Sequence, residues 1–292
     1  MRLYRARVPY QKAALIRNIL FAIMTSTTVD SAAPMALSIA LRRVSNLQKS
    51  LRWAWLDVVC QYRRSKIGPL WETINIVVMT LGIAVVSSAV FGGRLTNLIG
   101  YISLGIIAWS AVSSLITEGS NAFVRNAAMI RDTNIPIDLY IGRTVFKTLI
   151  TFGHHLILYF VGLLFFLVPL TWASLLAILG ISLLFANGFW VVTLLAFICA
   201  RFRDVELIVR NLLQLAFFVT PVFWNYQQVD ADHRYIIDYN PIFYFIEIIR
   251  APLLGYVPPV QHYLVIVGVT AVGYVVAYAV FIRMRRPLAF FV

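Results

Sequence analysis

Long stretches without a charged residue alternate with short basic clusters along this chain. The clearest stretch covers residues 73–93, which are 21 positions without Asp, Glu, Lys or Arg. Residues 95–117 and 260–282 form two more, each 23 residues long. A helix needs about 20 mostly apolar residues to cross a hydrocarbon core roughly 30 Å thick. Each of these stretches therefore predicts a membrane-spanning helix.

The longest uncharged stretch, residues 148–200, is too long for one span. Its 53 residues fit two spans joined by a tight turn at Pro169, Leu170 and Thr171. A shorter apolar stretch, residues 211–224, predicts a further span that ends near Pro221. The whole pattern predicts an all-α polytopic membrane protein with six transmembrane helices per subunit.

The segment before the first span, residues 46–66, has a different pattern. Apolar side chains recur there at three- and four-residue spacing opposite a polar face, and they are Leu47, Leu51, Trp55, Val58, Val59 and Tyr62. This spacing predicts an amphipathic helix, which lies in the plane of the membrane interface. A helix that packs on a partner protein would show the same pattern, so both interpretations stay open.

Two other segments are predicted not to cross the membrane. The apolar run within residues 1–45 is short and split by Arg17, which favours a cytoplasmic extension. Residues 240–255 are also short and carry Glu247 and Arg250, so we expect re-entrant or interfacial periplasmic helices with these charges near the membrane surface. The expected parts are the extension 1–45, the interface helix 46–69, the six-helix domain 70–283 and the cytoplasmic tail 284–292.

Positive charges gather on one side of the predicted spans. Lys and Arg number 12 before the first span, 4 around the second loop, 3 after the fourth span and 3 in the tail, which makes 22 of 25. The other three are Arg94, Arg234 and Arg250. Short cytoplasmic loops are enriched in Lys and Arg, so both termini are predicted to be cytoplasmic.

Composition excludes several classes of protein. The chain is 61% hydrophobic and 13% charged, which is too apolar for a soluble domain. Its net charge of +13 resides between the spans, so no nucleic-acid partner is expected. Cys60 and Cys199 are far apart and are predicted to be free thiols. The adjacent His154 and His155 would point about 100° apart on a helix, so we expect no metal site and only packing or polar contacts for them.

The chain shows no energy-coupling site of its own. No G-x-x-x-x-G-K-[ST] phosphate loop occurs, and none of the four lysines follows a glycine. Glu72, Glu118 and Glu247 lie near predicted interfaces and do not form a chain of carboxylates across the membrane. If the protein moves a substrate uphill, the energy must come from another subunit.

Three motifs resemble one family of transporters. They are QYRRSKIGPLW at 61–71, Arg203-Asp204 followed by LLQLAFFVTPVFW at 212–224, and Asn240-Pro241 followed by FIEIIRAPLLG at 245–255. In this order they resemble ABC-2 type exporters of polysaccharides and polyol phosphates, including O-antigen exporters of the Wzm type. The resemblance covers residues 46–285, and RDTNIPIDL at 131–139 matches it more loosely.

The resemblance implies a transport subunit and not an enzyme. Two copies would form a channel in the bacterial inner membrane and pair with two copies of a separate ATPase. That partner would bind ATP and Mg²⁺, so this chain would bind no cofactor. The substrate would be a polysaccharide such as O-antigen, linked to undecaprenyl pyrophosphate. Permeases for capsule, teichoic acid, a drug or a small lipid stay open as alternatives.

Four groups of residues are candidates for this function. Glycans have apolar C–H faces that suit aromatic side chains, and pyrophosphate suits Arg and Lys, although positive anchors are also common at membrane surfaces. The candidates are Arg63, Arg64 and Lys66 for the lipid headgroup; Tyr101, Trp109, Phe217, Phe218 and Trp224 for the channel; Arg125, Arg131 and Asp132 within the loop 118–138 for ATPase coupling; and Asn240, Pro241, Glu247 and Arg250 for the periplasmic gate.

An enzyme is the alternative from a different class. A membrane-embedded glycosyltransferase needs a carboxylate or a basic cluster that faces a lipid pyrophosphate. Glu72 with Arg63 and Arg64 is the candidate set for such a site. Within the gate, Glu247 and Arg250 stand at i and i+3 and are predicted to pair.

Overall fold

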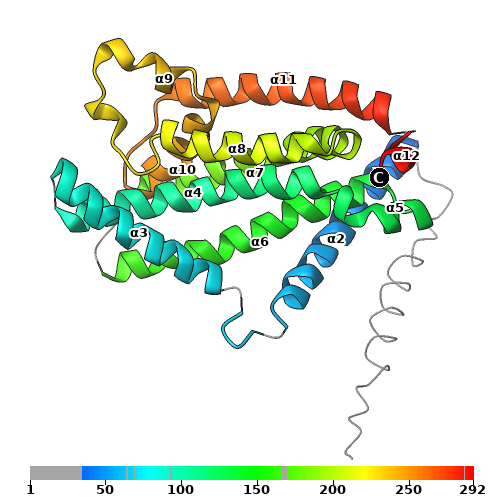
Figure 1. Cartoon of the computed structure of the whole chain (residues 1–292), viewed down its shortest axis with the longest axis horizontal. Helices are drawn as coiled ribbons and strands as arrows, with labels where there is room; N and C mark the ends of the chain where they lie inside the picture. The colour runs from blue at the N-terminus through cyan, green and yellow to red at the C-terminus, as the bar shows by residue number, and fades with distance from the viewer. Residues whose placement is uncertain (1–34, 64, 69, 93, 166–169, 286) are drawn as a thin grey trace, which may run out of the picture. The chain divides into compact units, whose positions relative to one another are not determined.

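The computed structural model describes residues 35–292 apart from 64, 69, 93, 166–169 and 286 (Figure 1). Residues 1–34, which make up most of the predicted N-terminal extension, lie outside the described residues. Every regular element in the described ranges is a helix, as the sequence predicted. The chain divides after Lys49 into two compact units, and the contacts discussed below lie within the second, Ser50–Val292.

Among the described residues, five helices are long and apolar enough to cross a membrane. They are α3 (Leu70–Phe91), α4 (Leu95–Asn121), α6 (Ile137–Leu164), α7 (Leu176–Arg201, preceded by the 3-10 turn η2, Trp172–Leu175) and α11 (Val260–Met284). Each coincides with a stretch that the sequence marked as a span. Five of the predicted spans are therefore present as helices, and the protein is a multi-pass membrane protein.

The sixth predicted span corresponds to α8 (Asp204–Val219), a shorter helix of 16 residues. At 1.5 Å per residue it is about 24 Å long, less than a hydrocarbon core of roughly 30 Å. Thr220 and Pro221 follow it directly, and the helix packs on α4 and α7. Length alone does not decide whether α8 crosses the membrane.

The predicted interface helix is longer than expected. α2 (Met35–Gln61) begins before residue 46 because neither Gly nor Pro interrupts the sequence between its ends. Leu51, Trp55 and Val59 on its apolar face are exposed at 45%, 55% and 48%. This face is therefore available to lipid or to a partner, as the amphipathic pattern predicted.

A neighbouring face of α2, one residue back along the chain, packs on the helical bundle. Ser50, Ala54 and Val58 are buried, and the Ser50 hydroxyl donates to the carbonyl of Leu139 on α6 at 3.4 Å. A Cβ on Gly142 would press against Ser50, so the glycine permits the close approach. Val58, which the sequence assigned to the apolar outer face, belongs to this packed face.

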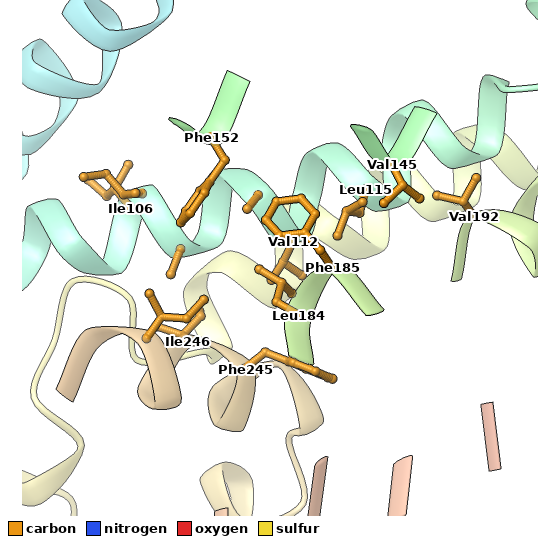
Figure 2. Packing of buried hydrophobic residues seen from close by; sticks show 14 of the residues in the cluster. Ile106, Val112, Leu115, Val145, Phe152, Leu184, Phe185, Val192, Phe245 and Ile246 are labelled. Carbon is orange, nitrogen blue, oxygen red and sulfur yellow. The ribbon is translucent and has the colours of Figure 1, made fainter. Parts of the chain in front are cut away.

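α4 is the central helix of the bundle. It packs against α3, α6, α7, α8 and α10 (Pro241–Leu253). Figure 2 shows Ile106, Val112 and Leu115 of α4 packed with Phe152 of α6 and Phe185 of α7. The core of the described unit is therefore built around the second predicted span.

α10 lies in the interior of the bundle, enclosed by α4, α7 and α11. Its backbone comes close to α7, because a Cβ at Gly180 would collide with the carbonyl of Ile248. Residues 245–253 are all buried. α10 is therefore buried by protein, and its placement as a re-entrant or interfacial helix stays a prediction.

The polar loop predicted at 118–138 is partly helical. α4 continues to Asn121, so Glu118 lies in its last turn and not in a loop. The chain then forms η1 (Val124–Asn126) and α5 (Ala127–Asp132) before α6. The remaining short elements are η3 (Tyr226–Gln228), η4 (Ala231–His233) and α9 (Tyr235–Asp238) between α8 and α10, and α12 (Leu288–Phe291) at the end of the described chain.

Candidate functional site

A polar pocket of about 460 Å³ lies where α2, the end of α4, η1 and α6 meet. Its lining combines carboxylates, basic groups and amides, including Asp57, Glu118, Arg125, Arg143 and Lys147. The three basic and two acidic side chains in this set leave one positive charge in excess. The pocket therefore holds most of its charges as matched pairs.

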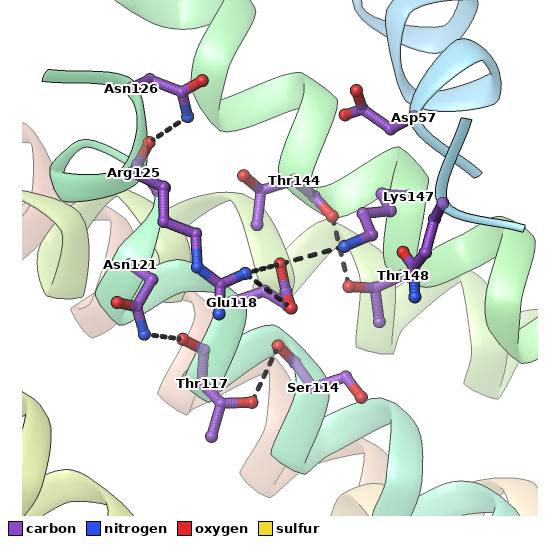
Figure 3. A network of polar contacts seen from close by, with 12 residues as sticks. Asp57, Ser114, Thr117, Glu118, Asn121, Arg125, Asn126, Thr144, Lys147 and Thr148 are labelled. Carbon is purple, nitrogen blue, oxygen red and sulfur yellow. Dashed lines mark hydrogen bonds and ion pairs between the residues drawn. The ribbon is translucent and has the colours of Figure 1, made fainter. Parts of the chain in front are cut away.

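The first set of paired charges is Glu118 of α4 with Arg125 of η1 and Lys147 of α6. Arg125 Nη1 lies 3.1 and 3.0 Å from the two carboxylate oxygens of Glu118, and Lys147 Nζ lies 3.3 Å from Glu118 Oε2 (Figure 3). Arg125 was a predicted coupling residue, and the structure anchors it to the bundle. Arg131 and Asp132 on α5 are exposed.

The second pair joins α2 to α6 and η1. Arg143 donates through Nε and Nη2 to the carboxylate of Asp57, with Nη2 2.7 Å from Oδ1, and through Nη1 to Asn126 Oδ1 at 2.9 Å. Its guanidinium also stacks 4.4 Å from the ring centre of Trp53. Sequence reasoning treated Arg143 only as a loop charge. Asp57 is the one acidic residue in the predicted interface helix, and this feature of the sequence could have indicated that a basic residue pairs with it.

The proposed headgroup residues lie between α2 and α3. Arg63 and Lys66 are exposed, and Arg64 lies outside the described residues. The neighbouring Tyr62 hydroxyl donates to Glu72, and burial together with this hydrogen bond raises the pKa of Tyr62. Among the described residues, Glu72 contacts Tyr62, and no contact with Arg63 is present.

The predicted pairing of Glu247 and Arg250 is present. Arg250 Nε and Nη2 donate to Glu247 Oε2 at 3.0 and 2.6 Å, and Nη1 donates to the carbonyl of Pro221 at 2.6 Å. The Arg250 guanidinium also lies 4.1 Å from the ring centre of Tyr101. Both charged side chains are buried inside the bundle, which the sequence did not predict. The reason is the enclosed position of α10, which the sequence of the segment alone does not reveal.

Asn240 and Pro241 form the start of α10. The Asn240 side chain accepts from the Ile242 backbone N–H at 3.0 Å, and proline suits the first turn because it lacks an N–H. Asn240 Nδ2 also donates to Thr220 Oγ1 at 2.8 Å. The motif therefore starts one helix and fastens it to the end of α8, a link to Thr220 that the sequence did not indicate.

The predicted channel aromatics come from two helices and meet. Trp109 of α4 and Phe217 of α8 have ring centres 5.4 Å apart, and Phe217 lies 5.5 Å from Phe218. The Tyr101 hydroxyl donates to the carbonyl of Trp224 at 3.2 Å. Phe218 is 60% exposed, whereas Trp109 and Phe217 are partly buried against each other. These contacts tie α8 to α4, and channel lining stays a prediction.

Cys60 is exposed and Cys199 is buried, and both are free thiols as predicted. Within the described ranges, no three His, Cys, Asp or Glu side chains gather as metal ligands.

Comparison with known sequences identifies the class of protein. The ABC-2 type transporter family matches residues 51–254, more than two thirds of the chain. The chain belongs to this family: it is a membrane permease, a transport subunit without a catalytic domain. Permeases of this family pair with ATPase subunits.

Individual relatives are distant. The chain is 24% identical over 191 residues to the O-antigen export system permease protein RfbA of Klebsiella pneumoniae, covering 64% of this chain and 72% of the relative. It is 26% identical over 169 residues to the protein of the same name from Myxococcus xanthus, covering 58% and 65%.

Proposed function

We propose that this chain is the channel-forming subunit of an ATP-driven exporter of a lipid-linked polysaccharide such as O-antigen. The observation that carries the proposal is the similarity to O-antigen export permeases from two different bacteria. Two copies would form the channel in the bacterial inner membrane, and two copies of an ATPase would bind ATP and Mg²⁺. The glycan would be linked to undecaprenyl pyrophosphate.

The proposed topology has six crossings and cytoplasmic termini. The distribution of 22 of 25 Lys and Arg residues on one side supports this orientation. α8 would be the remaining crossing, because its N-terminal Arg203 and Asp204 and the segment after Thr220 must lie on opposite sides if both termini are cytoplasmic. After α8 the chain continues through residues 220–224 toward Tyr101, which lies near the N-terminal end of α4. This continuation supplies the length that α8 lacks for a crossing.

The ATPase would contact η1 and α5, and its movements would be transmitted to the permease through these elements. These elements carry the exposed Arg131 and Asp132, which are free to meet a partner, while Arg125 and Asn126 fasten them to α4 and α6. Arg143 links the same segment to α2 through Asp57. A displacement of η1 would therefore reach both the bundle and the interface helix.

The glycan path would use the aromatic contacts between α4 and α8. Aromatic faces bind the C–H faces of sugars without fixing them through charge. Phe218 is exposed on this helix pair, and Trp109 and Phe217 lie behind it. The headgroup would contact the exposed Arg63 and Lys66 at the cytoplasmic start of α3.

A deletion strain tests the substrate. We expect loss of this gene to cause a lipid-linked glycan to accumulate on the cytoplasmic side, and co-expression of the permease with its ATPase to restore export. Analysis of the accumulated lipid distinguishes O-antigen from capsule or teichoic acid. Normal glycan export in the deletion strain, together with a new sensitivity to a drug, would favour the drug-permease alternative.

A further inference from the structure

α3 is attached to α4 and α6 by a narrow stripe of mostly small or polar side chains. The buried members of the stripe are Thr73, Ile76, Thr80, Ala84 and Ser87. Ile76 is the one large aliphatic residue among them, whereas Val78 and Val86 on the outer face are exposed at 63% and 61%. Burial of apolar area therefore contributes little to holding α3 in place, and polar contacts must contribute more.

Polar contacts of this kind gather at the cytoplasmic end of α3. The Tyr62 hydroxyl donates to Glu72 Oε1, and Thr73 Oγ1 donates to the carbonyl of His154 at 3.3 Å. His155 Nε2 lies 3.7 Å from Glu72 Oε2, and the His155 side chain is only 6% exposed. Nε2 has no closer polar partner within the described part of the chain. Glu72 is therefore the acceptor toward which a proton on this nitrogen points.

The other ring nitrogen of His155 determines where that proton resides. His155 Nδ1 lies 3.0 Å from Ser110 Oγ, and the same hydroxyl lies 2.7 Å from the carbonyl of Ile107. If Ser110 donates to Nδ1, the neutral ring carries its proton on Nε2. If Ser110 donates to Ile107, Nδ1–H donates to Ser110, and Nε2 carries a proton in the imidazolium form.

In the first arrangement an N–H of the neutral ring faces Glu72 Oε2 at 3.7 Å, and in the second arrangement only the charged form of the ring presents one. The serine hydroxyl lies within reach of both of its acceptors, so either arrangement leaves Ser110 with a partner. Lys147, a cation near Glu72, lies on the same helix as His155 and pairs with Glu118 at 3.3 Å. Among the described residues, His155 is therefore the basic side chain within ion-pair distance of Glu72.

We propose that His155 and Glu72 are positioning residues that hold the cytoplasmic end of the first span against the second and third. This inference rests on the proposed function, in which the lipid headgroup meets Arg63 and Lys66 directly before α3. Movement of α3 away from α6 would change the space available at that entrance. The pair would keep the entrance closed until the ATPase or the substrate separates the two helices.

Distance measurement between α3 and α6 tests the proposal. In a background of Cys60→Ser and Cys199→Ala, spin labels replace the exposed Val78 and Phe160 of the full chain, co-purified with its ATPase in lipid nanodiscs. We expect Glu72→Gln and His155→Phe to raise the population at longer distances by about tenfold or more, because the polar contact between Glu72 Oε2 and His155 Nε2, 3.7 Å long, is weakened or lost. His155→Gln, which keeps an N–H donor, should restore part of the original distribution.

A matched control removes a different carboxylate. Glu118→Gln breaks the contacts with Arg125 and Lys147 but touches nothing on α3, so the label distance should stay unchanged. Unchanged distances in both Glu72→Gln and His155→Phe would overturn the proposal, and if His155→Phe does not fold, the isosteric Glu72→Gln decides. The measurement needs no substrate, so failure of the proposed glycan function would leave this result interpretable.

Discussion

Arg250 donates two hydrogen bonds to one carboxylate oxygen of Glu247, and both side chains are buried inside the helical bundle. A third hydrogen bond reaches the carbonyl of Pro221, which follows α8, and the guanidinium faces the ring of Tyr101 on α4. The pair therefore fastens α10 to two other parts of the bundle. A charge pair in this position joins α10 to α4 and to the segment that follows α8.

Breaking this pair from one side should cost more than removing it. Glu247→Ala leaves Arg250 charged and buried, a change that costs about 3–5 kcal/mol at comparable sites. The double variant with Arg250→Ala should be less destabilised than the single one. Thermal unfolding in detergent and a double-mutant cycle measure this, and a coupling energy near zero would rule out the pairing.

Gly105 should not tolerate a side chain. A Cβ there would collide with the carbonyl of Val222, so we expect Gly105→Ala to destabilise the protein by about 1–3 kcal/mol. Gly82→Ala on α3 is the matched control, because no atom lies within 4 Å of its Cβ position. Equal melting temperatures for the two variants would contradict the close packing of the segment after α8 on α4.

Arg143 should be sensitive to a substitution that preserves its charge. Arg143→Lys removes the two-pronged contact with Asp57 and weakens the stacking on Trp53. We expect ATP hydrolysis that no longer responds to substrate, while the complex with the ATPase is still recovered. Arg210→Lys is the control, because Arg210 is 60% exposed and its surface pair with Glu206 contributes little. Equal coupling in both variants would remove the proposed role of Arg143.

Charge reversal at Arg131 tests the proposed ATPase contact. Arg131 is exposed on α5, so Arg131→Glu should leave folding and membrane insertion unchanged. We expect lower export-coupled ATP hydrolysis and weaker recovery of the ATPase on pull-down. The hypothesis fails if both quantities match those of the wild type.

The basic residues before α3 can be tested without changing charge. If they act only as positive anchors, the double variant Arg63→Lys, Arg64→Lys should keep both orientation and export. If they bind pyrophosphate, the orientation of the protein in the membrane should stay the same and export should fall, because lysine lacks the planar guanidinium that donates two hydrogen bonds in parallel. If the double variant exports glycan at the wild-type level and is as abundant as the wild type, the hypothesis that these residues contact pyrophosphate is wrong.

The helical class and the positions of the long helices were predictable from the sequence. Uncharged stretches of 21 and 23 residues leave few alternatives, since buried charges are costly in lipid. The pairing of Glu247 with Arg250 was also predictable, because helix geometry places i and i+3 side chains together. Both are local properties, because they follow from the spacing of residues along one stretch of the chain.

Contacts between residues that are distant in the sequence became visible only in the folded chain. The bonds from Arg143 to Asp57 and from Asn240 to Thr220, and the approach of His155 to Glu72, join residues on different helices. In the sequence, α10 is a short segment that carries charged residues. The structure nevertheless buries it, because parts of the bundle around it supply polar contacts for these charges. Pairing between helices depends on how they pack, and periodicity within one helix contains no information about its neighbour.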